Sequence, residues 1–242
     1  LVTSANDATI TLNDADNAFT GALTITTNDN SGTDAAVIID GGTTALIIAA
    51  STIDGNLTLT SGATAGITDS GTVTVGGDLA ATTDAGNGVI NMDQLAVDGT
   101  IALTTNGNGA ATVVNDAGLN LAASTVRGAL SATATTGDIS DSGNLVITGA
   151  ATFITTAAGR DIILDQSGNV FTGAVTLNTT GSTGHAEVDG GTTILDIAAS
   201  TIGGNLSLTS GHATGITDSG TVTVGGNLIA TNDVSNGDIN MG

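Results

Sequence analysis

The chain has 242 residues, of which 36 are glycine, whereas proline, cysteine, tryptophan and tyrosine are absent. Its 23 acidic residues are opposed by only two basic ones, which gives a formal net charge of −21 at pH 7. This charge repels phosphate groups and acidic lipid headgroups, so we expect no nucleic-acid partner and no membrane insertion. No apolar run approaches the length that spans a bilayer, and disulfides cannot contribute to stability.

The sequence is a tandem array. Residues 51–92 return almost unchanged at 200–241, and a weaker copy occupies residues 119–149. The period of about 74 residues is too long for one strand-turn-strand unit and indicates several stacked coils. We predict a single continuous segment over residues 1–242, with repeat units 1–42 (partial), 43–118, 119–191 and 192–242 (partial). The chain starts and stops partway through the pattern, so we expect it to be a window of a longer array.

In chain order, the predicted coils are of three types and are about 22 to 29 residues long. The third type begins at Ala18, Leu95 and Val170, the first type spans 43–71, 119–143 and 192–220, and the second type begins at Thr72, Asn144 and Thr221. Within a coil, apolar and polar residues alternate, as Val73 and Val75 do with Thr72 and Thr74, which predicts strands with one buried face. Each coil has about three such runs separated by turn residues, which fits a roughly triangular coil.

These patterns predict an all-β fold, a right-handed parallel β-helix (β-solenoid) of about ten coils, because stacked equivalent coils superpose like residues. Ten coils spaced as neighbouring strands would form a rod of about 48 Å. The alternative is an array of antiparallel hairpins, since Asn87-Gly88 and Asn236-Gly237 are typical two-residue turns. Neither end carries a polar, proline-containing or helical cap, so we expect open strand edges there.

Three stretches resemble a known family: residues 19–27 (FTGALTITT), 171–180 (FTGAVTLNTT) and 55–77 (GNLTLTSGATAGITDSGTVTVGG), with a copy of the last from Gly204. They resemble the β-strand repeats of filamentous haemagglutinin-like proteins, the giant exported adhesins of Gram-negative bacteria. The resemblance covers nearly the whole chain. It implies a right-handed parallel β-helix, export by two-partner secretion or as an autotransporter passenger, and a role in attachment, biofilm cohesion or contact-dependent delivery. The secretion-signalling N-terminal domain of that family is not seen in this sequence.

No catalytic, cofactor-binding or metal-binding residue is predicted. A phosphate-binding loop would need a lysine, and the GxSxG, HExxH and calcium-loop patterns do not occur. Asp69, Asp141 and Asp218 occupy the same turn in different copies, so we interpret them as turn formers and not as a catalytic pair. Phe19 and Phe171 are also equivalent, which favours packing over a platform for carbohydrate.

Four residues are not replicated. Arg127 and Arg160 have no basic counterpart in the other copies, and we expect both on the outer wall, where they offset neighbouring aspartates. His185 and His212 occur only in the later copy and are interpreted as surface residues, because a zinc site would need a third ligand. The acidic surface predicts at most weak, non-stoichiometric calcium binding.

Three functions remain open. The first, a non-enzymatic one, is a stalk or fibre segment of an exported bacterial surface adhesin, which associates with like chains end to end or laterally and reaches a host or matrix receptor. The second is an ice-binding solenoid with outward threonine rows, suggested by Thr72, Thr74, Thr221 and Thr223, although Asn144 interrupts the pattern. The third is a polysaccharide-degrading β-helix enzyme, which would need a non-repeated cluster of Asp, Arg and Lys in a groove.

Overall fold

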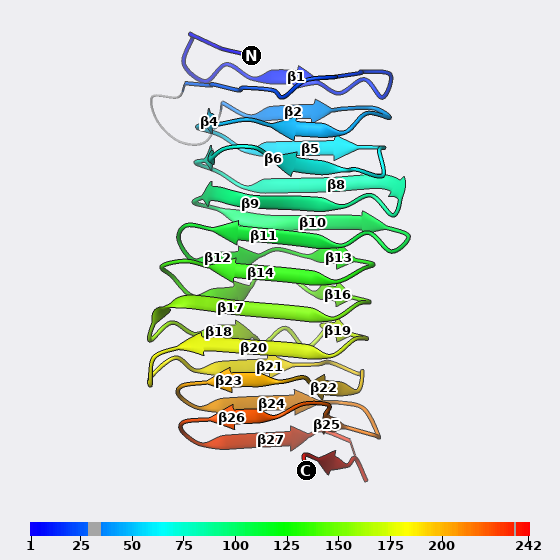
Figure 1. Ribbon diagram of the computed structural model, residues 1–242, viewed down its shortest axis with the longest axis vertical. Coiled ribbons are helices and arrows are strands. Elements are labelled where there is room, and N and C mark those ends of the chain that lie inside the picture. Colours follow the sequence, from blue (N-terminus) through cyan, green and yellow to red (C-terminus); the bar gives the residue numbers. More distant parts are fainter. Residues whose placement is uncertain (29–34, 235) are drawn as a thin grey trace. The chain divides into compact units, whose positions relative to one another are not determined.

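The computed structural model describes residues 1–28, 35–234 and 236–242, and all regular secondary structure in these ranges is β-strand. The parallel sheets stack as a β-solenoid of about nine turns, with about 22 residues per turn (Figure 1). This confirms the predicted fold class, with one turn fewer than expected. The chain divides into two compact units, Leu1–Asp116 and Ala117–Gly242.

The first unit contains two parallel sheets. One consists of β1, β2, β5, β8 and β10 in this order, and the other contains β3, β6, β9 and β11, with β4 and β7 also paired within it. The bounds are β1 (Ile10–Leu12), β2 (Val37–Asp40), β3 (Leu46–Ile48), β4 (Ser51–Ile53), β5 (Leu57–Ser61), β6 (Ile67–Asp69), β7 (Val73–Val75), β8 (Leu79–Gly86), β9 (Ile90–Val97), β10 (Thr100–Asn106) and β11 (Ala111–Asn115).

The second unit repeats this arrangement. One sheet runs through β12, β15, β18, β21, β24 and β27, with β13, β16 and β19 beside it, and the other runs through β14, β17, β20, β22, β25 and β28, with β23 and β26 beside it. The bounds are β12 (Leu119–Leu121), β13 (Ser124–Val126), β14 (Leu130–Ala134), β15 (Ile139–Asp141), β16 (Leu145–Ile147), β17 (Ala151–Ala158), β18 (Ile162–Leu164), β19 (Val170–Phe171), β20 (Val175–Thr180), β21 (Ala186–Asp189), β22 (Leu195–Ile197), β23 (Ser200–Ile202), β24 (Leu206–Ser210), β25 (Ile216–Asp218), β26 (Val222–Val224), β27 (Leu228–Asn232) and β28 (Ile239–Asn240).

Strand pairing excludes the hairpin alternative. The paired strands in both units are parallel, and each strand pairs with a strand of the neighbouring coil. In Figure 1, β14, β17 and β20 lie in front and run to the left, whereas β18 and β21 lie behind them and run to the right. The chain descends from one coil to the next. This is right-handed winding, as expected for parallel crossovers.

The strands of each unit form two sheets, and a coil contributes two or three strands to them. The long strand β20 pairs with both β22 and β23 of the next coil, so these two short strands follow each other end to end along β20. Ser200 supports the bend between them: its hydroxyl donates to the carbonyl of Ala198 (2.8 Å) and accepts from the amide of Leu177 (3.0 Å). The hydroxyl thereby replaces a backbone acceptor at the bend, and Ser51 makes the same pair of bonds in the first unit.

The core lies between the two sheets and consists of columns of aliphatic side chains. Leu57 and Leu59 of β5 are fully buried, whereas Thr58 between them is partly exposed. The repeat equivalents Ile53 and Ile202 are both buried, which confirms the predicted faces. Because the sheets are stacked in register, buried aliphatic residues of one coil lie beside those of the next, as Leu57 does beside Val37 and Leu79.

Successive copies of the sequence repeat are offset from each other by half a turn of the solenoid. This offset was not predicted from the sequence. In the second unit, Leu119 pairs with Ile139, Ile139 with Ile162, and Ile162 with Ala186, so three turns separate β12 from β21. The equivalent of Leu119 is Leu195, which follows on the opposite sheet. A repeat of about 74 residues therefore spans three and a half turns, not the three coils expected, and equivalent strands of successive copies alternate between sheets.

Candidate functional site

A ladder of polar side chains precedes the strands of one sheet in the second unit. Asp138 accepts a hydrogen bond from the amide of Asp161 (2.9 Å), and Asp161 accepts one from the amide of His185 (2.7 Å). His185 accepts through Nδ1 from the amide of Asn205 (2.8 Å), and Asn205 accepts from Asn227 (2.8 Å). Each side chain thus binds the backbone of the next coil. His185 is exposed, as predicted, and takes the place of an aspartate or asparagine in the ladder.

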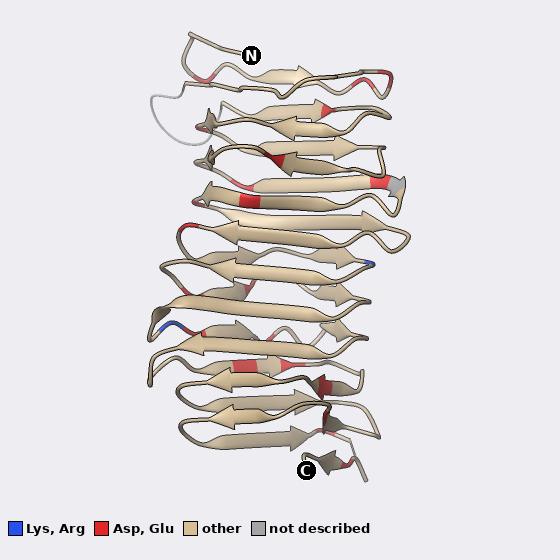
Figure 2. Ribbon diagram, viewed as in Figure 1, with Lys and Arg blue, Asp and Glu red and all other residues tan. Residues whose placement is uncertain are grey.

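The first unit has the same ladder. Asn56 accepts from the amide of Asp78 (2.8 Å), and Asp78 accepts from both the amide (2.7 Å) and the hydroxyl (2.9 Å) of Thr100. Figure 2 shows the acidic residues distributed along both units, mostly at turns and strand ends. The carboxylates accept hydrogen bonds from backbone amides of the neighbouring coil and so satisfy these amides.

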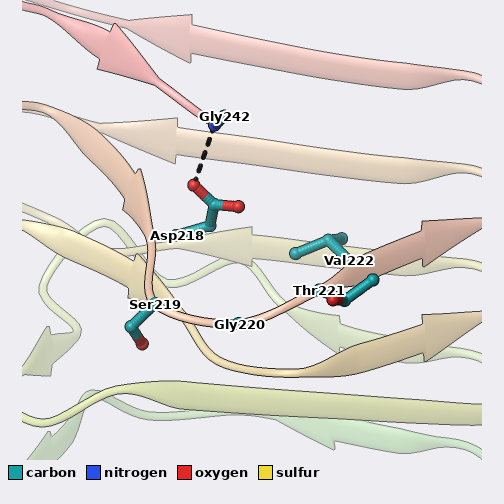
Figure 3. A pocket seen from close by; sticks show the side chains of 6 residues that line it. All are labelled: Asp218, Ser219, Gly220, Thr221, Val222 and Gly242. Carbon is teal, nitrogen blue, oxygen red and sulfur yellow. Dashed lines mark hydrogen bonds between the residues drawn. The ribbon is translucent and has the colours of Figure 1, made fainter.

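The aspartates of the repeated TDSG turn also bind the following coil. Asp69 accepts from the amides of Asp93 (3.2 Å) and Gln94 (2.9 Å), and Asp218 accepts from the amide of Gly242 (3.1 Å) (Figure 3). Burial raises the pKa of Asp69, and hydrogen bonds from the two amides oppose this shift. Asp69 is the last residue of β6 and Asp218 the last residue of β25, and their side chains connect neighbouring coils.

Asp141 is the most deeply buried of these aspartates, at 6% exposure. It accepts from the side-chain amide of Asn169 (2.7 Å) and from the backbone amide of Asp165 (3.1 Å). The carbonyl oxygen of the Asn169 side chain accepts in turn from the amide of Leu145 (2.8 Å). Burial raises the pKa of Asp141, although the hydrogen bond from Asn169 favours the charged form. The cluster is a closed structural network, and a catalytic role would need an accessible carboxylate.

Sequence reasoning missed a set of buried hydroxyl groups at the coil corners. Thr83 donates to the carbonyl of Gly88 (2.9 Å), and Thr155 donates to the carbonyl of Arg160 (3.1 Å). Thr105 and Thr179 make equivalent bonds. Each of these threonines occupies an inward position of the alternating pattern. That placement among apolar residues is the signal from which the role could have been inferred.

The remaining residues singled out from the sequence have ordinary positions. Arg127 and Arg160 are exposed, and His212 is partly buried and accepts through Nδ1 from the amide of Thr214 (3.0 Å). Phe171 is buried and packs edge-on against Phe153, with ring centroids 6.2 Å apart and an angle of 84°. The partly buried Phe19 is its equivalent in the first unit.

A metal site is not evident in the part of the chain that the structure describes. Within residues 1–28, 35–234 and 236–242, no group of three or more His, Cys, Asp or Glu side chains is placed to hold a metal ion. The same residues include no helix that is long and apolar enough to cross a membrane.

The turn from Asp218 to Val222 connects β25 to β26 and is shown from close by in Figure 3. A hollow of about 490 Å³ lies here, lined by Asp218, Ser219, Gly220, Thr221, Val222 and Gly242 (Figure 3).

Comparisons with known proteins point to a repeat family. A family model described as repeats of unknown function (DUF5649) matches residues 107–178 and 183–241, which together are more than half of the chain. No curated protein and no solved structure matches the chain.

Proposed function

We infer a structural role for this chain, which belongs to the family of repeats of unknown function DUF5649. We propose that it is a stalk or fibre segment of an exported bacterial surface adhesin or extracellular filament, acting in attachment or in cohesion between cells. The observation that supports this role is the use of polar side chains to connect coils. Asp138, Asp161, His185 and Asn205 each bind the backbone of the next coil. Because each of these side chains binds the next coil, the same contact can be repeated along a longer stack. The side chains are distributed along the stack and do not form a single reaction centre.

The extracellular location and the receptor belong to the same proposal. They follow from the resemblance to filamentous haemagglutinin-like repeats, and a solenoid without cysteine is compatible with export because stacking supplies its stability. The net charge of −21 favours partners other than nucleic acid. We propose self-association through the coil ends as the main contact, with a host or matrix receptor as the second partner.

The half-turn displacement disfavours an ice-binding role. Thr201 and Thr223 lie on neighbouring strands, β23 and β26, of one sheet. Their repeat equivalents Thr125 and Val146 lie on β13 and β16, in the opposite sheet of the same unit. An ice-binding surface needs one continuous flat row of threonines, whereas successive repeats present theirs on opposite sides. A polysaccharide-degrading role is disfavoured because the carboxylates of the partly buried Asp69 and the buried Asp141 already accept hydrogen bonds from the following coil.

The fibre role can be tested by sedimentation velocity and electron microscopy of the chain over a range of concentrations. We expect particles that lengthen with concentration and keep a constant width. Ile229→Asp places a charge on the outer strand β27 and should suppress elongation, because like charges at an edge oppose strand pairing. Ser207→Asp is the matched control, since Ser207 pairs with Ile229 one coil further in. Discrete particles at all concentrations, or equal effects of the two substitutions, would contradict the proposal.

A further inference from the structure

We propose that a hollow at one corner of the second unit binds a neutral sugar that carries an acetamido group. The hollow has a volume of about 340 Å³ and is lined by Phe171, Thr172, Thr192, Thr193, Ile194 and His212. This inference deepens the proposed function and rests on it in one respect, because it assigns a chemical class to the receptor.

The hollow spans three successive coils at the corner that precedes β22 (Figure 1). Thr172 precedes β20, Ile194 precedes β22 and His212 precedes β25, and these three strands are neighbours in one sheet. A further coil lies beside the loop of His212, because the side chain of Asn232 donates to the carbonyl of His212 (3.1 Å). The hollow is therefore a feature of the side wall of this unit, with coils on both sides.

The backbone that forms the hollow is held by hydrogen bonds that also occur in the first unit. The hydroxyl of Thr193 donates to the carbonyl of Gly190 (2.8 Å), and that of Ser210 donates to the carbonyl of Thr193 (3.0 Å). Thr44 and Ser61 make the equivalent bonds, at 2.7 Å and 3.0 Å. The repeat thus supplies the same scaffold at both corners, and the side chains on it can be compared directly.

Two of the six lining residues differ between the copies, and both are larger in the second unit. Ile194 stands where the first unit has Ala45, and His212 stands where it has Ala63. The other four, a phenylalanine and three threonines, are the same in both copies. Alanine satisfies the scaffold at both positions in the first unit, so packing does not require the larger side chains. Both differences fall on one hollow, which indicates a ligand.

The two larger residues define what the ligand must present. Nδ1 of His212 accepts from the amide of Thr214 (3.0 Å), so the proton of the neutral ring is on Nε2, which is a donor. Ile194 is 40% exposed and offers an uncovered aliphatic surface in the same hollow. A ligand that uses both needs an oxygen acceptor next to a small apolar group. The carbonyl and methyl of an acetamido group meet this requirement.

The shared residues suit a neutral hydroxylated ring. Thr172 and Thr192 are exposed, and each hydroxyl can donate and accept. Phe171 is 1% exposed and packs against Phe153, so it forms the floor of the hollow and is not a stacking platform. The net charge of −21 repels carboxylated and sulfated sugars. The volume is at the lower end of the range for ligand sites, which fits a small ligand.

Saturation-transfer NMR with N-acetylglucosamine tests the site, and glucose is the matched probe without the acetamido group. We expect N-acetylglucosamine to bind and to shift the imidazole resonances of His212, while those of His185 outside the hollow stay in place. Glucose should bind about tenfold more weakly or less, because the donor of His212 then lacks its acceptor. No binding of N-acetylglucosamine, or equal binding of the two sugars, would overturn the inference.

Variants that exchange the two copies test the residues on scaffolds that already accept them. Ile194→Ala and His212→Ala install the side chains of the first unit, and each should weaken binding about tenfold. The reverse double variant, Ala45→Ile with Ala63→His, should create a second site and double the sugar bound at saturation. Unchanged affinity in the alanine variants together with unchanged stoichiometry in the double variant would overturn the inference.

Fibre formation is measured separately, by sedimentation velocity of the same variants. Neither Ile194→Ala nor His212→Ala alters a coil end, so both should elongate as the unmodified chain does. Elongation without sugar binding would overturn the site and leave the fibre role with a different receptor. Sugar binding without elongation would support the site and contradict the fibre role.

Discussion

At the scale of single residues, the aspartate side chains that precede or end the strands bind the backbone of the next coil. Asp141 illustrates the cost of this arrangement, because its carboxylate is buried and its pKa is raised above the ordinary value of 3.8 by burial. A buried carboxylate that is harder to ionise in the folded state binds a proton more tightly there than in the unfolded chain. The folded state therefore gains stability as the pH falls from neutral toward the ordinary pKa, and loses it as the pH rises.

This sign can be measured by urea unfolding between pH 7 and pH 4. We expect the free energy of unfolding to rise as the pH falls in this window, and Asp141→Asn to reduce that rise, because the substituted side chain does not titrate. Glu187→Gln on the exposed face of β21 removes the same charge and is the control. If Asp141→Asn and Glu187→Gln changed the slope equally, the effect would arise from net charge and not from burial of Asp141.

At the scale of elements, strand stability depends on the alternation between the core and the surface. Leu57 and Thr58 are adjacent on β5, and only Leu57 points into the core, where it aligns with Val37 and Leu79 of the neighbouring coils. Each inward column is continuous through the coils, so a defect in one coil also removes contacts from the coils above and below it.

Substitutions at Leu57 should therefore be far more costly than those at Thr58. We expect Leu57→Ala to lower the free energy of unfolding by about 2–5 kcal/mol, and Leu57→Asp to cost more, because it buries a carboxylate without a partner. Thr58→Asp on the outer face should cost about 1 kcal/mol or less. Thermal and urea unfolding of the three variants provide the comparison. Similar losses for Leu57→Ala and Thr58→Asp would mean that the faces are assigned incorrectly.

At the scale of the whole molecule, 23 acidic residues against two basic ones make electrostatic repulsion the main obstacle to association. The acidic groups are distributed along turns in both units (Figure 2), so the negative charge is not concentrated in one pocket. Divalent cations should reduce repulsion between surfaces through many weak contacts. Monovalent salt should reduce it only by screening.

We expect calcium at about millimolar concentration, the order typical of weak extracellular sites, to promote association of the chain. Sedimentation velocity in calcium chloride and in sodium chloride of equal ionic strength distinguishes bridging from screening. Association should be stronger in calcium. Calorimetry that revealed one stoichiometric site of submicromolar affinity would contradict this distributed binding, as would identical behaviour in the two salts.

Much of the fold could be predicted because the repeat and the period-two pattern are local properties. The alternation of Leu57, Thr58 and Leu59 identifies strand faces without any knowledge of neighbours. Recurrence of the period-two pattern through the chain indicates stacked coils, since each coil then has the same inward and outward faces as its neighbours. The turn aspartates were identified for the same reason, because Asp69, Asp141 and Asp218 recur in equivalent turns. Their hydrogen bonds to the following coil could not be predicted, because the partners lie more than twenty residues away.

The sequence by itself determined the strands, their inward faces, the parallel solenoid and the absence of disulfides, all of which depend on composition and local periodicity. Only the tertiary structure decided how many turns one repeat occupies, and with it which sheet each copy lies on. Coil length varies, as the pairs Leu119–Ile139 and Ile162–Ala186 show, and these small differences accumulate to half a turn over the repeat. Register between coils is a property of packing and hydrogen bonding across the stack, so no single coil contains it.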